Sequence, residues 1–230
     1  QYDVFHEIVN LTELDLEGNK IIIIGARTFN RFQKLKVLNL RGNQIGRIEG
    51  GTWNFMFTSI TTITDIQIGI NPRIIEPYLL KYFPSLKSLS LKGNITKELI
   101  DSAKNMKLHN LKIENCLTKL DIDYFKHFNE LRDLQIEYST IRFIKLGEFC
   151  SFPKLKKLVI ISGQLNAIKP GTFDGLKQLQ ELNLMRNKLN DIQEGVFGRV
   201  NHKSVISILY DINNTISKNC ETDEGLLLLQ

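Results

Sequence analysis

The stretch LTELDLEGNKIIIIGARTF, residues 11–29, contains four consecutive isoleucines, Ile21 to Ile24. A short apolar run of this kind fits a buried strand or the beginning of a membrane segment, and its immediate neighbours do not decide between them. The chain reads LKVLNLRGNQIGRIEGGTW at residues 35–53, with leucine, asparagine and an aromatic residue at the same spacings. The isoleucine run is therefore one part of an internal repeat.

The repeated frame is L-x-x-L-x-L-x-x-N-x-L, with its positions numbered from the first leucine. Its starts are spaced by 22 to 28 residues and fall at Leu11, Leu35, Ile63, Leu86, Leu108, Leu131, Leu155 and Leu179, with a weaker one at Lys203. Position 9 is Asn19, Asn43, Asn71, Asn94 and Asn187 in five repeats, and Cys116, Ser139, Gly163 and Asp211 in the others. Position 19 is aromatic in the regular repeats, at Phe29, Trp53, Phe149, Phe173 and Phe197.

Each part of the frame has a physical reason. L-x-x-L-x-L predicts a short strand whose leucines face a shared core while the x positions face outward. Position 9 falls in a turn, where a stack of asparagine side chains can donate to and accept from backbone groups that the sheet leaves unpaired. We therefore expect Asn19, Asn43, Asn71, Asn94 and Asn187 to form a structural ladder. Ile21 and Ile24 are expected to point inward, and Ile22 and Ile23 to be partly exposed.

The chain resembles the leucine-rich repeat family over essentially its whole length. The 24-residue period with an aromatic position 19 is most similar to the typical subclass of secreted and cell-surface proteins, such as Toll-like, Slit-like and chaoptin-like ectodomains. The middle repeats depart from this pattern, and position 19 is Lys104 in the fourth. The resemblance implies an α/β repeat solenoid, an arc with a parallel concave sheet and an irregular or short-helical convex side.

The frame predicts a single array over residues 1–230, with about nine repeats. Residues 1–10 match the end of a preceding repeat, because Phe5 and Ile8 fall at positions 19 and 22. Residues 203–230 match a weak last repeat and the start of a tenth at Leu227. These boundaries favour a fragment of a longer protein, cut within a repeat at both ends. The alternative is a complete small protein with degenerate caps.

The sequence contains no motif typical of a catalytic or metal site. It has four histidines, none at ligand spacing with another histidine or cysteine, and no G-x-S-x-G, phosphate-binding loop or H-E-x-x-H. We therefore expect no catalytic residue, no metal and no cofactor. The longest apolar runs are four residues, whereas a membrane span needs about 20. Buried thiols are expected at Cys116 and Cys150, and an exposed one at Cys220.

Three N-x-S/T sequons occur, at Asn10, Asn94 and Asn213. Asn94 holds a ladder position and is expected to be buried. Asn10 and Asn213 flank strands, so we expect both to carry glycan if the protein is secreted.

The x positions of the later strands predict a binding surface on the concave face. Frame position 7 is charged or glycine in the first six repeats and apolar in the last three. Exposed apolar and aromatic groups that line up across strands are typical of interface centres. The predicted partner-binding residues are Tyr138, Val159, Ile161, Met185, Arg186, Leu209 and Tyr210. The alternative is that β-branched residues simply suit strands, or that a later repeat covers Leu209 and Tyr210.

These features predict a non-catalytic recognition scaffold for a protein ligand or co-receptor. The resemblance implies a secreted glycoprotein or a receptor ectodomain with a role in signal transduction. Charges of both signs alternate on the first repeats, which suits a protein partner better than nucleic acid. The alternative is an intracellular adaptor, either a ubiquitin-ligase substrate receptor or an enzyme regulatory subunit. A third interpretation is the recognition domain of an enzyme whose catalytic part lies elsewhere.

Overall fold

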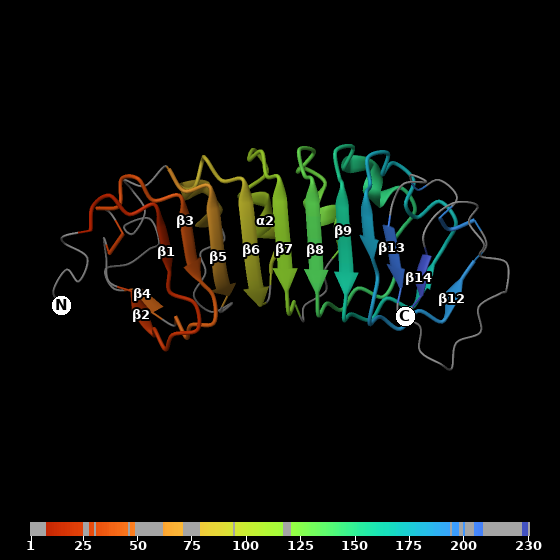
Figure 1. The fold of residues 1–230 in the computed structure, drawn as a ribbon, viewed down its shortest axis with the longest axis horizontal. Helices are drawn as coiled ribbons and strands as arrows, with labels where there is room; N and C mark the ends of the chain where they lie inside the picture. The colour runs from red at the N-terminus through yellow and green to blue at the C-terminus, as the bar shows by residue number, and fades with distance from the viewer. Residues whose placement is uncertain are drawn as a thin grey trace. The chain divides into compact units, whose positions relative to one another are not determined.

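The computed structural model describes residues 8–24, 28–29, 31–45, 47–48, 62–70, 79–93, 95–116, 121–193, 195–197, 200, 205–208 and 227–229. The chain divides into two compact units, residues 1–108 and residues 109–230. Within each unit, successive repeats place one strand beside the next in a parallel sheet, as the arrows in Figure 1 show.

The sheet of the first unit contains four parallel strands in chain order. They are β1 (Glu13–Asp15), β3 (Val37–Leu40), β5 (Asp65–Ile70) and β6 (Ser88–Gly93). A separate parallel pair joins β2 (Ile23–Ile24) to β4 (Arg47–Ile48). The connecting segments include the 3-10 helix η1 (Leu79–Tyr82) and the short helix α2 (Lys97–Asp101), whose first turn is capped by the Thr96 hydroxyl.

The second unit repeats this plan. Its sheet contains, in order, β7 (Asn110–Glu114), β8 (Asp133–Glu137), β9 (Lys157–Ile161), β11 (Glu181–Asn183), β13 (Val205–Ile208) and β14 (Leu227–Leu229). A parallel pair joins β10 (Ala167–Ile168) to β12 (Asp191–Ile192). The 3-10 helices η2 (Ile122–Phe125) and η3 (Glu148–Ser151) lie in the connecting segments.

Frame positions 4 and 6 supply the core. Each is at most 1% exposed in the described strands from the second repeat to the eighth: Leu38, Leu40, Ile66, Ile68, Leu89, Leu91, Leu111, Ile113, Leu134, Ile136, Leu158, Ile160, Leu182 and Leu184. The aromatic rings of position 19 pack behind them, and Phe149, Phe173 and Phe197 stack with ring centroids 5.9 and 6.0 Å apart. The predicted repeat solenoid with a parallel sheet and short-helical connections is confirmed.

The isoleucine run contributes one side chain to this core. Ile24 is 4% exposed, whereas Ile22 and Ile23 are 55% and 40% exposed, as expected. Ile21 is partly buried, and its backbone N–H donates to the Asn43 side chain.

Asparagine at position 9 links one turn of the chain to the turn before it. The Asn43 amide nitrogen donates to the carbonyls of Leu16 and Leu40 at 2.8 and 3.1 Å, and its oxygen accepts from Ile21 N–H. Asn187 makes the equivalent hydrogen bonds: it donates to the carbonyls of Ile160 and Leu184 and accepts from Leu165 N–H. Asn19 donates within its own turn, to Leu16 and Glu17. Asn71 and Asn94 lie outside the described residues.

Position 8, at the end of each strand, adopts a left-handed backbone conformation. The φ angle is positive at the three glycines Gly18, Gly42 and Gly93, and also at Asn115, Tyr138, Ser162 and Arg186. Asn115 and Ser162 are small polar residues, whereas Tyr138 and Arg186 are large ones that rarely adopt this conformation. A positive φ therefore recurs at position 8 in seven repeats, whichever residue occupies it, whereas position 8 of the third repeat is Ile70, the last residue of β5.

The ladder changes character in the second unit. Cys116 and Ser139 are buried at position 9, and in the described part of the chain the Ser139 hydroxyl has no hydrogen-bond partner. A Cβ built on Gly163 would lie 2.9 Å from the Asn187 side-chain oxygen and 3.3 Å from the Ser139 hydroxyl. Gly163 therefore lets the turns on either side approach closely, and it supplies no side-chain donor.

The substitution Gly163→Ala should destabilise the second unit by about 1–3 kcal/mol, because the added methyl group pushes against the Asn187 amide. Gly69→Ala is the matched control, since a Cβ there meets nothing closer than 3.9 Å. We expect the control to be neutral or slightly stabilising. Urea unfolding followed by circular dichroism compares the two, and equal midpoints would contradict the steric argument.

Candidate functional site

The outward residues of the second sheet lie in rows that cross the strands. Glu137 of β8 is in register with Ile161 of β9, and Ser162 N–H donates to the Met185 carbonyl at 3.1 Å, which continues the row. Position 7 thus changes from charged to apolar along three successive turns. Ile161 and Met185 are both half-buried, so each presents part of an apolar side chain to solvent.

Two larger side chains stand at the next position of the same turns. Tyr138 is 50% exposed with φ 52°, and Arg186 is exposed with φ 57°. A large residue held in the left-handed region costs of the order of 1 kcal/mol relative to glycine, and such costs are concentrated at functional positions. We call Tyr138, Ile161, Met185 and Arg186 the strand-end patch.

Val159 does not belong to this exposed surface. It was expected to face outward into solvent, but it is only 5% exposed. It lies in register between Gln135 of β8 and Asn183 of β11, and the side chains around it cover a small valine. Val159 is therefore not available to a partner on this face. Leu209 and Tyr210 lie outside the described residues.

Asn183 also shapes the edge of the patch. Its side-chain oxygen accepts from Met185 N–H at 3.0 Å, which turns the chain away after three strand residues. Asp15 and Asn39, at the same frame position, accept from Glu17 and Arg41 N–H in the same way. A side chain that bonds the backbone two residues ahead competes with the sheet ladder. Val159 cannot make this bond, and β9 continues for five residues to Ile161.

The charged residues beside the patch are paired with one another. Lys112 Nζ lies 2.8 Å from Glu137 Oε1, and Lys157 Nζ lies 2.9 Å from Glu181 Oε2. Both pairs join neighbouring strands. They leave the face with alternating charge rather than a continuous basic strip.

Asp133 is the exception among these charges. Its Oδ2 accepts from Gln135 Nε2 at 3.2 Å, while its buried Oδ1 has no hydrogen-bond partner in the described part of the chain. Burial raises the pKa of Asp133, and the Gln135 hydrogen bond and the Lys157 charge oppose this rise only in part. The sheet face therefore holds a carboxylate whose charge is poorly compensated.

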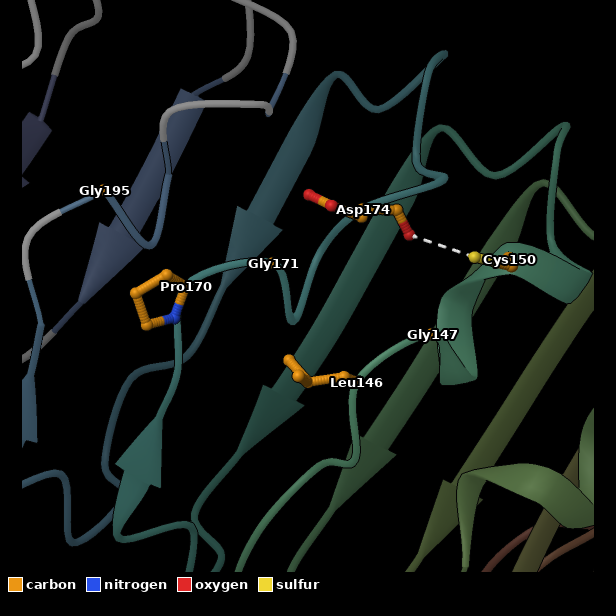
Figure 2. Close-up of a pocket in the computed structure, with 7 residues that line it drawn as sticks. All are labelled: Leu146, Gly147, Cys150, Pro170, Gly171, Asp174 and Gly195. Atoms are coloured by element: carbon orange, nitrogen blue, oxygen red, sulfur yellow. Dashed lines mark hydrogen bonds between the residues drawn. The ribbon is translucent and has the colours of Figure 1, made fainter.

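A groove of about 520 Å³ lies among the connecting segments of the second unit, and none of the strand-end patch residues lines it (Figure 2). It is lined by Leu146, Gly147, Cys150, Pro170, Gly171, Asp174 and Gly195. The three glycines occupy frame position 17 in successive repeats, and all have positive φ, between 78° and 83°. The glycine that recurs at position 17 is a sequence signal for this groove, which the leucine frame alone does not predict.

Cys150 was expected to be buried, and this is wrong, because its thiol is exposed. In the single turn of η3, Phe149 occupies the core and the next residue turns outward. The thiol donates weakly to the Asp174 carbonyl at 3.7 Å, as Figure 2 shows. Cys116 is buried as a thiol, as expected, and Cys220 lies outside the described residues.

An ionic cluster joins two of these connecting segments. Lys145 Nζ lies 2.8 Å from Asp121 Oδ2 and 3.4 Å from Glu148 Oε1. Burial raises the pKa of Glu148, whereas the pKa of Asp121 is lowered because hydrogen bonds from Lys145 and Asp123 outweigh its partial burial. The pKa of Lys145 is raised by Asp121. Lys145 thus joins two carboxylates from two connecting segments in one structural ion cluster.

Asn10 is exposed in a turn ahead of β1, where a glycan would meet solvent. Asn94 and Asn213 lie outside the described residues. Within the described ranges, no group of three or more histidine, cysteine, aspartate or glutamate side chains is placed to hold a metal. No helix among the described residues is long and apolar enough to cross a membrane.

A family model for the leucine rich repeat matches residues 4–56 and 153–202. These two segments are leucine-rich repeats. No curated protein sequence matches the chain. Among solved structures, TLR13 in its complex with ssRNA13 aligns with a TM-score of 0.68 and 24% identity over 86% of this chain and 28% of that one. A Leptospira interrogans leucine-rich repeat protein aligns at 0.60 and 19% identity, over 85% of this chain and 48% of that one.

These structural similarities extend over most of this chain and establish the repeat fold alone. The chain spans less than half the length of either solved structure. Residues 57–152, which separate the two segments matched by the family model, include the middle repeats in which position 19 is not aromatic.

The substitution Asp133→Asn should stabilise the protein at pH 7 and give no advantage at pH 3. The raised pKa means that the stability contribution of Asp133 is complete below the ordinary value of 3.8 and is lost as pH rises through the folded-state pKa. The pH dependence of the melting temperature checks this.

Glu98 is the control, because its pKa is shifted in the opposite direction to that of Asp133. Its pKa is lowered by a backbone hydrogen bond and by the Thr96 hydroxyl at the start of α2. Glu98→Gln should therefore reduce stability above the ordinary value of 4.5 and not at pH 3. The same sign of change in both variants at pH 7 would contradict the assignment.

Proposed function

We propose that this leucine-rich repeat protein is a non-catalytic recognition scaffold that binds a protein partner through the strand-end patch. The observation that carries the proposal is the row of Tyr138, Ile161 and Met185, which presents aromatic and apolar surface across three neighbouring turns, with Arg186 beside it. Tyrosine, methionine and arginine are enriched at the centres of protein interfaces.

The charges on the same face favour a protein partner over nucleic acid. TLR13, whose fold is similar, is described in a complex with ssRNA13. Phosphate binding requires a series of uncompensated lysine and arginine side chains. Here Lys112 and Lys157 are each paired with a glutamate on the adjacent strand, and Asp133 stands between them. A phosphate backbone laid across these strands would meet alternating charge.

We place the protein outside the cell or at its surface, as a secreted protein or receptor ectodomain. The exposure of Asn10 within its sequon supports this, as does the regular aromatic position 19 of repeats such as the seventh and eighth. One observation favours the alternative of an intracellular adaptor. Neither Cys116 nor Cys150 is in a disulfide in the described part of the chain, and an exposed thiol such as Cys150 is more common in a reducing compartment.

The double substitution Ile161→Glu with Met185→Glu should leave the fold intact and weaken partner binding tenfold or more. Both side chains are half-buried at the surface, so the added carboxylates reach solvent, yet they place charge in the centre of the patch. Proteins captured by cross-linking from the native source are quantified by mass spectrometry for wild type and variant.

The control is Gln178→Glu with Gln180→Glu, which adds the same two charges at exposed positions outside the patch. It should retain all captured proteins, and both variants should melt within a few degrees of the wild type. Undiminished capture by the patch variant would show that the partner binds elsewhere.

The intact mass of the native protein, before and after removal of N-linked glycans, decides the compartment. We expect a mass decrease that disappears in an Asn10→Gln, Asn213→Gln variant. A free-thiol count accompanies it, with Cys150 reacting readily and Cys116 only after unfolding, because Cys116 is 0% exposed. Absence of glycan together with three free thiols would support the intracellular adaptor instead.

A further inference from the structure

We propose that the segment recognised by the strand-end patch is an amphipathic α-helix that lies across β8, β9 and β11. Its apolar side chains contact Tyr138, Ile161 and Met185 on successive turns, and its carboxyl end lies toward Arg186. This inference rests on the proposed function and specifies the partner's structure.

The spacing of the patch is set by the sheet. Tyr138 N–H donates to the Ile161 carbonyl at 3.1 Å, and Ser162 N–H donates to the Met185 carbonyl at 3.1 Å, so each patch residue lies one strand from the next. Neighbouring strands are about 4.8 Å apart. The two intervals between these three residues therefore span about 9.6 Å, along a line that crosses the strands.

An α-helix matches this spacing. Residues i, i+3 or i+4, and i+7 face one side, and each turn advances about 5.4 Å. Over two turns an untilted helix exceeds the patch by only about 1.2 Å, and a tilt of about 27° removes the difference. Each turn of the helix can then place one side chain on each repeat.

An extended segment does not match it. Side chains on one face of a strand recur about every 6.7 Å, so two intervals exceed the patch by about 3.8 Å. Such a segment would have to turn well away from the row and lose contact with either Tyr138 or Met185. The residues that the structure exposes therefore favour a helical partner.

The charges at the two ends of the row give the helix a direction. Glu137 lies at one end, where its carboxylate is held by Lys112 at 2.8 Å, and Arg186 lies at the other. Within the described part of the chain Arg186 forms no ion pair, and it is exposed. A helix carries partial positive charge at its amino end and partial negative charge at its carboxyl end. The favourable orientation places the amino end over Glu137 and an acidic last turn beside Arg186.

Two display libraries test this proposal. The first carries 20-residue peptides on an alanine, glutamate and lysine background that favours helix, with positions i, i+4, i+7 and i+11 randomised. The second is identical except for a proline at its centre, which breaks the helix. Both are selected against the immobilised protein and counted by sequencing. We expect enrichment from the helical library only, with apolar residues at i, i+4 and i+7 and an acidic residue at i+11.

Enriched peptides are then measured by fluorescence anisotropy against three variants. Ile161→Glu with Met185→Glu and, separately, Tyr138→Gly should each weaken binding about tenfold or more, while Gln178→Glu with Gln180→Glu should not. Tyr138→Gly removes the ring at a position whose φ of 52° glycine adopts freely, so its melting temperature should not fall. Arg186→Glu should reverse the preference at i+11 from acidic to basic.

The outcomes distinguish failure of the helical-partner proposal from failure of the strand-end patch as a binding site. Equal enrichment from the proline library, with binding still lost in the patch variant, would retain the patch as a binding site and overturn the helical partner. A helical library that gives no enriched peptide would also overturn the helical partner. Enriched peptides that bind the patch variant as well as the wild type would overturn both the helix and the strand-end patch.

Discussion

The turn that follows each strand is the constraint on which this structure depends. There the chain leaves the sheet, and its amide and carbonyl groups would be buried without partners. The side chains of Asn43 and Asn187 solve this by bonding two successive turns at once, with contacts to the carbonyls at frame position 6 of both. The bonding needs a left-handed residue just ahead of the asparagine, at position 8. Tyr138 and Arg186 share that conformation, so both side chains leave the chain at the same point of their turns.

Strand length is the second variable that shapes the candidate site. Where position 5 is Asp15 or Asn183, its side chain caps the backbone ahead and the strand ends after three residues. Where position 5 is Gln135 or Val159, the strand runs five residues and carries position 7 within the sheet. The strand-end patch lies where the five-residue strand β9 is followed by the three-residue strand β11. Ile161 is held in the sheet, whereas Met185 stands just past the end of a strand, so the patch joins a rigid position to one in a turn.

Much of this architecture could be predicted from residue spacing. The period placed the inward leucines and the parallel strands, and it separated Ile24 from the exposed Ile22 and Ile23. Spacing could not predict how neighbouring side chains cover a small residue, and for that reason the burial of Val159 came as a correction. It also gave no information on which way a single 3-10 turn rotates, and Cys150 was assigned to the wrong side of η3. The left-handed position 8 was present as a signal in Gly18, Gly42 and Gly93, but only the structure shows that larger residues share it.

The regular register also determines how such a chain can reach its native state. Glu13 pairs with Val37 and Asp133 with Lys157, so the sheet forms between segments that are close in sequence. Closing loops of this length costs little entropy, and ordering can begin at any adjacent pair of turns and spread to the next. Its progress depends on the strength of each junction. The turns at Ser139 and Gly163 do not themselves supply the double amide link of Asn43 and Asn187, so we expect ordering to spread less readily across the junction between them.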